Sequence, residues 1–236
     1  MIKAVLFDMD GVLYDSMPSH AQAWHETMSN LGADSSEEEF YMLEGRTGKS
    51  TINIIFNRSF NRDATPEEIQ EIYAKKSERF MELEYPESKP MQGAIEVLNK
   101  VKALGLTRMI VTGSGQYSLF EKLDKHYPEF FDKDLMVTAY DVQFGKPHPE
   151  PYLIGLKKGN LKPEEAIVIE NAPLGVESGK AAGIYTVAVN TGLLPDKILW
   201  ASGANALYPD MYALAENIED LIAKVSLDSL KYKRIA

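Results

Sequence analysis

Two aspartates that directly follow a buried-strand pattern are the residues of this sequence best suited to chemistry. The apolar run Ala4–Phe7 stops at Asp8, and Asp10 and Gly11 follow. Such a run, bounded by turn residues, is typical of a strand buried on both faces of a parallel sheet. Open parallel sheets bind their ligands outside the carboxyl ends of the strands. One carboxylate could therefore attack an electrophile while the other transfers a proton.

Three further groups of polar residues stand where predicted strands or turns bring them to the same edge. In chain order they are Thr112-Gly113-Ser114, Gly145-Lys146-Pro147 and Glu170-Asn171. A hydroxyl and backbone amides at a strand-to-helix turn can bind phosphoryl oxygens, and a fixed lysine can stabilise developing negative charge. Hard oxygen ligands suit Mg²⁺. Any one of these turns alone is usually only a turn, but the ordered set indicates an active site.

Helical patterns dominate the segment that follows the two aspartates. Between Ser16 and residue 84, apolar residues recur at helical spacing and no convincing strand occurs. Thr65 followed by Pro66 is a clear helix start. The segment is predicted to form about four helices, entered through a linker at 15–19 and left through a proline-bracketed linker at 85–90.

Helices and strands alternate in the rest of the chain. After Ala4–Phe7, strands are predicted at residues 109–112, 135–139, 166–170 and 185–189, with a short edge strand at 204–208. This alternation predicts a parallel sheet with right-handed crossovers. We therefore expect an α/β fold, in which residues 1–15 and 89–236 form a Rossmann-like parallel sheet core and residues 16–88 an inserted helical cap domain.

Composition limits the classes of partner. The chain has 236 residues, 44% of them hydrophobic, and an acidic excess that gives a net charge of −10. This charge argues against nucleic acid as a partner, and an anionic substrate would need local cations or a metal. The sequence has no cysteine, and no apolar stretch approaches the ~18 residues of a membrane span. We expect a cytoplasmic, monomeric enzyme that does not bind membranes.

The four motifs, in this order, resemble those of the haloacid dehalogenase superfamily. They read Asp8-Met9-Asp10-Gly11-Val12-Leu13, Val111-Thr112-Gly113-Ser114, Gly145-Lys146-Pro147-His148-Pro149-Glu150-Pro151 and Ile169-Glu170-Asn171-Ala172. The helical insert and the stretch Ser-His-Ala-Gln-Ala-Trp at 19–24 are similar to the β-phosphoglucomutase-like branch. Membership would imply Mg²⁺-dependent transfer of a phosphoryl group from a small phosphorylated substrate, through an aspartyl phosphate.

The resemblance and the residue chemistry together assign expected roles. Asp8 is the expected nucleophile. Asp10 is the expected acid/base, and because an ordinary aspartic acid has a pKa of about 3.9, a closed site should favour its protonated form. The residues expected to hold the transferring phosphoryl group are Thr112, Gly113, Ser114 and Lys146. The expected Mg²⁺ ligands are Asp8, the backbone carbonyl of Asp10, and Glu170 or Asn171.

The insert contains a loop, residues 44–50, that invites interpretation as a P-loop. A P-loop has four residues between its first glycine and Gly-Lys-Ser, and only two separate Gly45 from Gly48. Nucleotide binding is therefore not expected. Instead, Arg46 can bind phosphate bidentately and Lys49 adds positive charge, so both are predicted to contact the substrate.

The histidines carry weaker signals. His20, a candidate substrate-binding residue, either steers the cap hinge or packs against Trp24, and the sequence leaves both interpretations open. His148 is expected to be structural.

Glu44 sets this sequence apart. Many relatives carry two acids where this chain has Glu170-Asn171, so one negative charge near the metal is missing. Glu44 could restore it by reaching Mg²⁺, directly or through water, from a closed cap. That would shorten the cavity, and the combination also resembles a pyrophosphatase-like offshoot. Inorganic pyrophosphate is therefore the expected substrate, and the alternative is a β-phosphoglucomutase or a sugar-phosphate phosphatase.

A non-catalytic protein that binds a phosphorylated metabolite is the alternative from another functional class. Binding alone needs neither a nucleophile nor an acid/base, whereas Asp8, Asp10 and Lys146 are all present. An enzyme is therefore the preferred interpretation.

Overall fold

Five short strands form one parallel sheet within the part of the chain that the computed structural model describes, residues 1–84, 88–115 and 117–233. The order across the sheet is β2-β1-β3-β4-β5. The strands are β1 (Ala4–Phe7), β2 (Thr107–Ile110), β3 (Ala166–Glu170), β4 (Tyr185–Val189) and β5 (Ala206–Tyr208). The expected α/β fold with a parallel sheet is confirmed, and β1 lies inside the sheet, which explains why all its residues are apolar and buried.

The register of the sheet brings the motif residues to one edge. Phe7 is paired with Ile110 on β2 and with Ile169 on β3. The next residue along each strand therefore leaves the sheet at the same level. The amide of Asp8 still donates to the Ile169 carbonyl at 3.0 Å, and the amide of Val111 donates to the Phe7 carbonyl at 2.8 Å. The carboxyl edge of the sheet is thus where the polar motifs meet.

Helices cover both faces of the sheet. Val5 and Phe7 point into the larger apolar cluster, which includes residues of α5 (Ala94–Ala103) and α10 (Met211–Lys233). Ala4 and Leu6 point into a second cluster on the opposite face, which includes α7 (Glu150–Lys158). The remaining core elements are α6 (Tyr117–His126), α8 (Pro173–Ala181), α9 (Asp196–Ala201) and the 3-10 turns Lys133–Leu135 and Pro163–Glu165.

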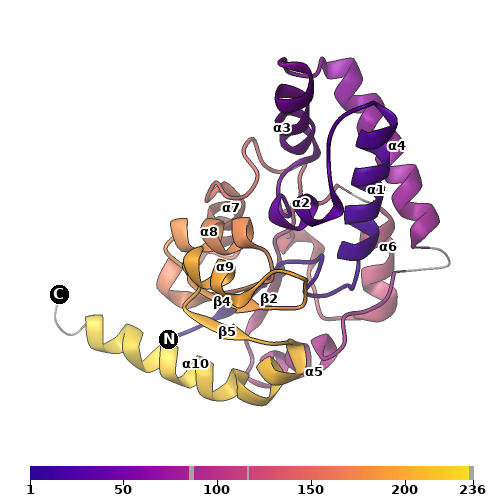
Figure 1. The fold of residues 1–236 in the computed structure, drawn as a ribbon. Helices are drawn as coiled ribbons and strands as arrows, with labels where there is room; N and C mark the ends of the chain where they lie inside the picture. The colour runs from indigo at the N-terminus through magenta and orange to yellow at the C-terminus, as the bar shows by residue number, and fades with distance from the viewer. Residues whose placement is uncertain (85–87, 116, 234–236) are drawn as a thin grey trace.

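The predicted insert forms helices, as expected. They are α1 (Met17–Asn30), α2 (Glu37–Met42), α3 (Gly48–Phe60) and α4 (Pro66–Leu83). Figure 1 shows them as a group above the sheet. They share their own apolar cluster, which includes Trp24, Phe40, Ile52 and Ile72. Thr65 caps α4 in a capping box. Part of the predicted return linker, residues 85–87, lies outside the described residues.

The strand predicted at residues 135–139 is wrong. Only a single parallel bridge, between Val111 and Val137, forms there. The reason lies in Asp141, whose Oδ2 accepts from the Thr138 amide at 2.8 Å and from its hydroxyl at 2.9 Å. This side chain bends the backbone into a turn one residue after the bridge, so no further ladder can form.

The helical insert lies directly on the sheet edge. A Cβ atom on Gly113 would lie 2.4 Å from the carbonyl oxygen of Gly45 in the α2–α3 loop, so only glycine allows this approach. A second contact comes from the loop between β4 and α9. Its Leu194 is buried in the apolar cluster of the insert, while the Thr191 hydroxyl donates to the Gly11 carbonyl at 2.6 Å. The structure is therefore a closed arrangement.

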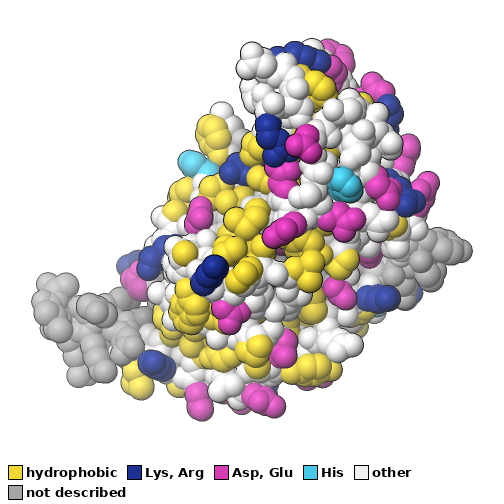
Figure 2. Space-filling model, in the orientation of Figure 1, with side chains coloured by type: hydrophobic (Ala, Val, Ile, Leu, Met, Phe, Trp, Pro, Cys, Tyr) yellow, Lys and Arg dark blue, Asp and Glu magenta, His cyan; other side chains and the backbone are white. Residues whose placement is uncertain are grey.

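The surface shows no broad basic region on the face drawn in Figure 2, where the coloured lysine and arginine side chains are interspersed with carboxylates. Among the described residues, no helix is both long and apolar enough to cross a membrane.

Candidate active site

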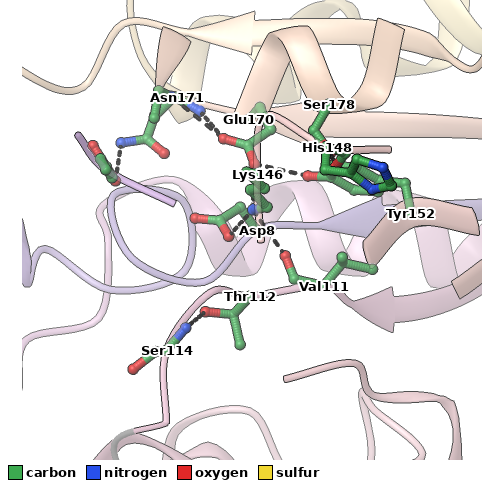
Figure 3. A network of polar contacts seen from close by, with 12 residues as sticks. Asp8, Val111, Thr112, Ser114, Lys146, His148, Tyr152, Glu170, Asn171 and Ser178 are labelled. Atoms are coloured by element: carbon green, nitrogen blue, oxygen red, sulfur yellow. Dashed lines mark hydrogen bonds and ion pairs between the residues drawn. The ribbon is translucent and has the colours of Figure 1, made fainter. Parts of the chain in front are cut away.

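A buried lysine joins two of the carboxylates at the sheet edge (Figure 3). The Nζ of Lys146 lies 2.5 Å from Asp8 Oδ1 and 2.5 Å from Glu170 Oε1, and it donates to the Val111 carbonyl at 3.1 Å. Only 1% of Lys146 is exposed. Burial opposes its charge, but the two carboxylates outweigh burial and raise its pKa. Lys146 is therefore a fixed cation beside Asp8.

The carboxylate of Glu170 holds Lys146 in position. Its Oε1 also accepts from the Tyr152 hydroxyl at 2.7 Å, and its Oε2 accepts from the amides of Asn171 and Ala172 at 3.1 and 3.3 Å. Both carboxylate oxygens are thus engaged, and the side chain is fully buried. The structure places Glu170 behind Lys146 instead of facing the cavity. Tyr152 was not predicted, because a tyrosine on the apolar face of a helix carries no distinguishing signal.

The surroundings of Asp8 carry excess negative charge. Burial raises its pKa to about 8, Lys146 acts against this shift, and Glu170 and Asp10 add to it. One lysine thus faces several carboxylates in a site from which water is largely excluded. Such a site favours the binding of a further cation.

Asp10 is held by two donors on one oxygen. Its Oδ1 accepts from the Ser16 hydroxyl at 2.6 Å and lies 3.2 Å from Nε2 of His20. Burial opposes ionisation of Asp10, but His20, Ser16 and Lys76 outweigh it, so the pKa of Asp10 is lowered. This differs from the sequence expectation of a protonated Asp10, because the donors come from the insert, whose contacts the sequence does not show.

A lysine that sequence reasoning missed completes this chain of contacts. Nζ of Lys76, on α4, lies 2.5 Å from Nδ1 of His20. The ionised carboxylate of Asp10 can only accept, so Nε2–H of the neutral His20 ring donates to Asp10 and Nδ1 accepts from Lys76. Burial lowers the pKa of Lys76 to about 7, and burial and Lys76 lower the pKa of His20. The position of Lys76 on the apolar stripe of α4, with Tyr73 and Phe80, was the signal that could have revealed this lysine.

Thr112 and Ser114 lie at the same edge. The Ser114 amide donates to Thr112 Oγ1 at 3.0 Å, and Thr112 is 2% exposed. A phosphoryl oxygen would therefore compete with Thr112 for this amide. Gly113 lies between them, under the Gly45 carbonyl.

The α2–α3 loop places its two basic residues differently. Arg46 lines the cavity, its NH1 group donates to Ser50 Oγ at 3.2 Å, and its Nε is buried without a partner. Lys49 is exposed and is not among the residues that line the cavity. The structure therefore brings Arg46 to the site and leaves Lys49 outside it. The ring of His148 packs against Phe144 at a tilt of 40°, with ring centroids 5.0 Å apart, in keeping with a structural role.

A cavity lies between the sheet edge and the helical insert. One end contains Asp8, Asp10 and Thr112 of the core. The insert contributes apolar and aromatic side chains (Met17, Trp24, Phe40, Leu43 and Tyr73) together with the polar side chains of His20, Glu44, Arg46, Thr51 and Lys76. The complete lining is Asp8, Asp10, Met17, His20, Trp24, Phe40, Leu43, Glu44, Gly45, Arg46, Gly48, Thr51, Tyr73, Lys76, Thr112, Gly113 and Ser114.

Comparison with known proteins establishes the family. Residues 5–189 match the model of the family described as haloacid dehalogenase-like hydrolase. The chain belongs to this family. It is 31% identical over 208 residues to the "Phosphorylated carbohydrates phosphatase" of Thermotoga maritima, covering 87% of this chain and 94% of that protein. It is 33% identical over 194 residues to "Hexitol phosphatase A" of Escherichia coli, covering 80% and 83%.

Solved structures agree with this assignment. The structure described as "Putative beta-phosphoglucomutase from Bacteroides vulgatus" superposes with a TM-score of 0.89 and 54% identity, over 98% of this chain and 90% of that one. This haloacid dehalogenase-like hydrolase is thus of the β-phosphoglucomutase-like type with a helical cap, and it is an enzyme of the phosphatase and phosphomutase class. The resemblance to a pyrophosphatase-like offshoot is not supported, because these relatives are named for carbohydrate and hexitol phosphates and for a mutase.

The donor atoms of this hydrolase fit a magnesium ion. Asn171 Nδ2 donates to Glu44 Oε1 at 2.8 Å, which leaves Asn171 Oδ1 buried and without a partner. Such an oxygen requires a cation or a donor. No group of three His, Cys, Asp or Glu side chains suited to a metal occurs in the described residues. Asp8, the Asp10 carbonyl and Asn171 would supply a mixed set of hard oxygens to such an ion.

Replacing Asn171 with Ala should weaken Mg²⁺ binding by at least about 10-fold, since loss of even a supporting residue costs that much. We expect Mg²⁺ to raise the Tm of the wild type, and to raise that of Asn171→Ala much less at equal concentration. Thermal unfolding and calorimetric titration with MgCl₂ measure this without turnover. Asn217→Ala, on the exposed face of α10, is the matched control, and equal Mg²⁺ affinity in all three proteins would exclude Asn171 as a ligand.

Replacing Lys76 with Met should stabilise the hydrolase in a pH-dependent way. The pKa of Lys76 is about 7 in the folded state and about 10.4 in an unfolded chain. Between these values the unfolded chain binds a proton that the native state does not, so wild-type stability rises with pH. The advantage of Lys76→Met is therefore largest below pH 7 and shrinks toward pH 10. Urea unfolding at pH 6.5 and 9 measures it, and a constant difference would contradict the assignment.

Proposed function

We propose that this enzyme hydrolyses phosphate monoesters of small sugars or polyols through a phosphorylated Asp8. The observation that carries the proposal is the two-sided cavity, with Asp8 and Asp10 at one end and Met17, Trp24 and Tyr73 in the opposite wall. Apolar and aromatic walls suit the carbon skeleton of an ester. Inorganic pyrophosphate has no such part. The names of the relatives support the same substrate class.

In the first step, Asp8 Oδ2 attacks phosphorus, the ester P–O bond breaks, and Asp10 gives its proton to the leaving alcohol oxygen. Asp8 Oδ1 stays on Lys146, which fixes the direction of the other oxygen. Asp10 is ionised in the substrate-free site. The like charge of a bound phosphate dianion raises its pKa, so that Asp10 takes up a proton from solvent when the ester binds. The donors from Ser16 and His20 hold Asp10 in position throughout.

In the second step, Asp10 removes a proton from water, the water oxygen attacks phosphorus, and the P–O bond to Asp8 breaks. Inorganic phosphate leaves, Asp8 is again a free carboxylate, and Asp10 releases to solvent the proton that it took up when the ester bound. Mg²⁺, when bound by Asp8, the Asp10 carbonyl and Asn171, would neutralise charge on the phosphoryl oxygens. A mutase would use the same residues, with a sugar hydroxyl in place of water.

The test is a comparison of kcat/KM for glycerol 3-phosphate, sorbitol 6-phosphate, β-glucose 1-phosphate and pyrophosphate with Mg²⁺ present. We expect at least one ester to exceed pyrophosphate. Phosphorus NMR of the glucose 1-phosphate reaction separates isomerisation from hydrolysis. A rate for pyrophosphate above that for every ester would overturn the proposal.

Inorganic pyrophosphate is the second candidate, favoured by one contact. Glu44 reaches from the cap to Asn171 and is 9% exposed. Burial, and after it the charge of Asp8, raise the pKa of Glu44 well above its ordinary value. A carboxylate in such surroundings is suited to a place close to a cation. If pyrophosphate is the substrate, Glu44→Gln should lower kcat/KM for pyrophosphate more than for a hexose phosphate. A ratio that stays flat or rises would remove this candidate.

A further inference from the structure

Tyr73 occupies space that is open only because residue 48 is glycine. A Cβ atom on Gly48 would lie 2.3 Å from Tyr73 Cδ2 and 2.4 Å from Cε2, far inside van der Waals contact. Both residues line the cavity. The ring of Tyr73 therefore stands directly against the first turn of α3, where any other residue type would displace it.

The ring of Tyr73 also contacts the aromatic side chains of the insert. Tyr73 and Trp24 have ring centroids 6.1 Å apart at an angle of 54°, and Trp24 stacks on Phe40 at 6.0 Å. The Tyr73 backbone belongs to α4, in which the Ser77 hydroxyl donates to the Tyr73 carbonyl at 2.7 Å. A ring confined in this way acts as a rigid wall.

The ring of Tyr73 belongs to the cap side of the cavity, whereas the nucleophile belongs to the core side. Asp8 and Thr112 come from the core, whereas Tyr73 comes from α4, one turn before Lys76. A phosphate placed at Asp8 would thus direct its organic group toward the aromatic side chains. Because the cap lies against Gly113 in the closed arrangement, the group has to fit between them.

We propose that Tyr73, seated over Gly48, is a specificity-determining residue that limits the length of the organic group. The inference rests on the proposed hydrolysis of sugar or polyol phosphates and selects short polyol phosphates within that class. Substitutions on the two sides of the contact act in opposite directions. Tyr73→Ala opens the wall and admits longer esters. In Gly48→Ala the ring has to leave its present position, and we expect it to enter the cavity that both residues line and to exclude longer esters.

The experiment compares kcat/KM for sorbitol 6-phosphate and glycerol 3-phosphate in four proteins. Relative to wild type, Tyr73→Ala should raise the sorbitol-to-glycerol ratio by about 10-fold or more, the scale of a few methylenes in an apolar pocket. Gly48→Ala should lower it by a similar factor. Tyr73→Phe keeps the ring and should keep the wild-type ratio, and circular dichroism checks the fold of each protein.

A second measurement needs no turnover. Calorimetric titration of the same two esters into Asp8→Asn, with and without the Tyr73 and Gly48 substitutions, gives the ratio of their affinities. The same opposite shifts are expected. If Tyr73→Ala does not fold, Tyr73→Leu replaces it, since leucine also removes the far end of the ring.

The outcomes separate the two proposals. A wild type that hydrolyses only pyrophosphate refutes the proposed function, and the titrations then test the wall by themselves. Three results would refute the proposed role of Tyr73. They are unchanged ratios, ratios that shift in the same direction in Tyr73→Ala and Gly48→Ala, and a Tyr73→Phe protein that behaves like Tyr73→Ala. A failure of both esters to bind Asp8→Asn would also refute the proposed role of Tyr73.

Discussion

Asp8→Asn is expected to abolish turnover, by on the order of 10⁴-fold or more, while leaving the protein folded. The amide is a poor nucleophile, and knockout of a nucleophile elsewhere costs factors of this size or larger. Steady-state phosphate release measures the loss. The matched control is Asp15→Asn, an exposed aspartate in the adjacent linker, which should retain activity. Appreciable turnover in folded Asp8→Asn would rule out an aspartyl phosphate on this residue.

The same substitution should stabilise the metal-free protein. The pKa of Asp8 is about 8 in the folded state and about 3.9 in an unfolded chain. Between these values the native state binds the extra proton, so the wild type loses stability as pH rises. The stability gain of Asp8→Asn should therefore be small near pH 4 and grow up to about pH 8. Urea unfolding in EDTA at pH 5 and 8 checks this, and a gain that shrinks with pH would contradict it.

Lys146→Met should cost both stability and activity. It removes the cation between Asp8 and Glu170, and breaking a buried pair typically costs about 3–5 kcal/mol because a charge is left uncompensated. Loss of a group that stabilises transition-state charge lowers kcat by about 10²–10³-fold. Urea unfolding and steady-state kinetics measure the two effects.

The control variants separate charge from packing. Lys133→Met breaks an exposed ion pair with Asp124 and should cost at most about 1 kcal/mol. The double variant Lys146→Met/Glu170→Gln removes one of the two stranded carboxylates, so it should recover part of the stability but none of the activity. Recovery of turnover in the double variant would show that Lys146 acts only as a structural partner of Glu170.

The part of the site that lies on strand ends could be predicted from sequence. Each motif follows an apolar run, and parallel strands end at a common edge. Asp8, Thr112 and Glu170 therefore had to meet once the sheet was recognised. The same logic failed at residues 135–139, because the side chain of Asp141 captures the Thr138 amide and ends the pairing. Local capping of this kind competes with strand formation.

The part of the site that depends on cap closure could not be predicted. The pKa of Asp10 is lowered because His20, Ser16 and Lys76 outweigh burial, and Ser16 donates to Asp10 in place of capping α1. Lys49 was expected at the substrate because of its charge, yet the first turn of α3 carries it outward. These outcomes depend on the angle at which the cap meets the sheet, which periodicity does not encode.

The loop between β4 and α9 has a consequence for recombining this enzyme with its relatives. Leu194 completes the apolar cluster of the cap, although it lies more than a hundred residues beyond α4. A chimera that exchanges α1–α4 alone would leave Leu194 facing a foreign surface. Crossover points should therefore be chosen so that residues 190–195 travel with the cap. The neighbouring residue Leu193 is 77% exposed and could be exchanged freely.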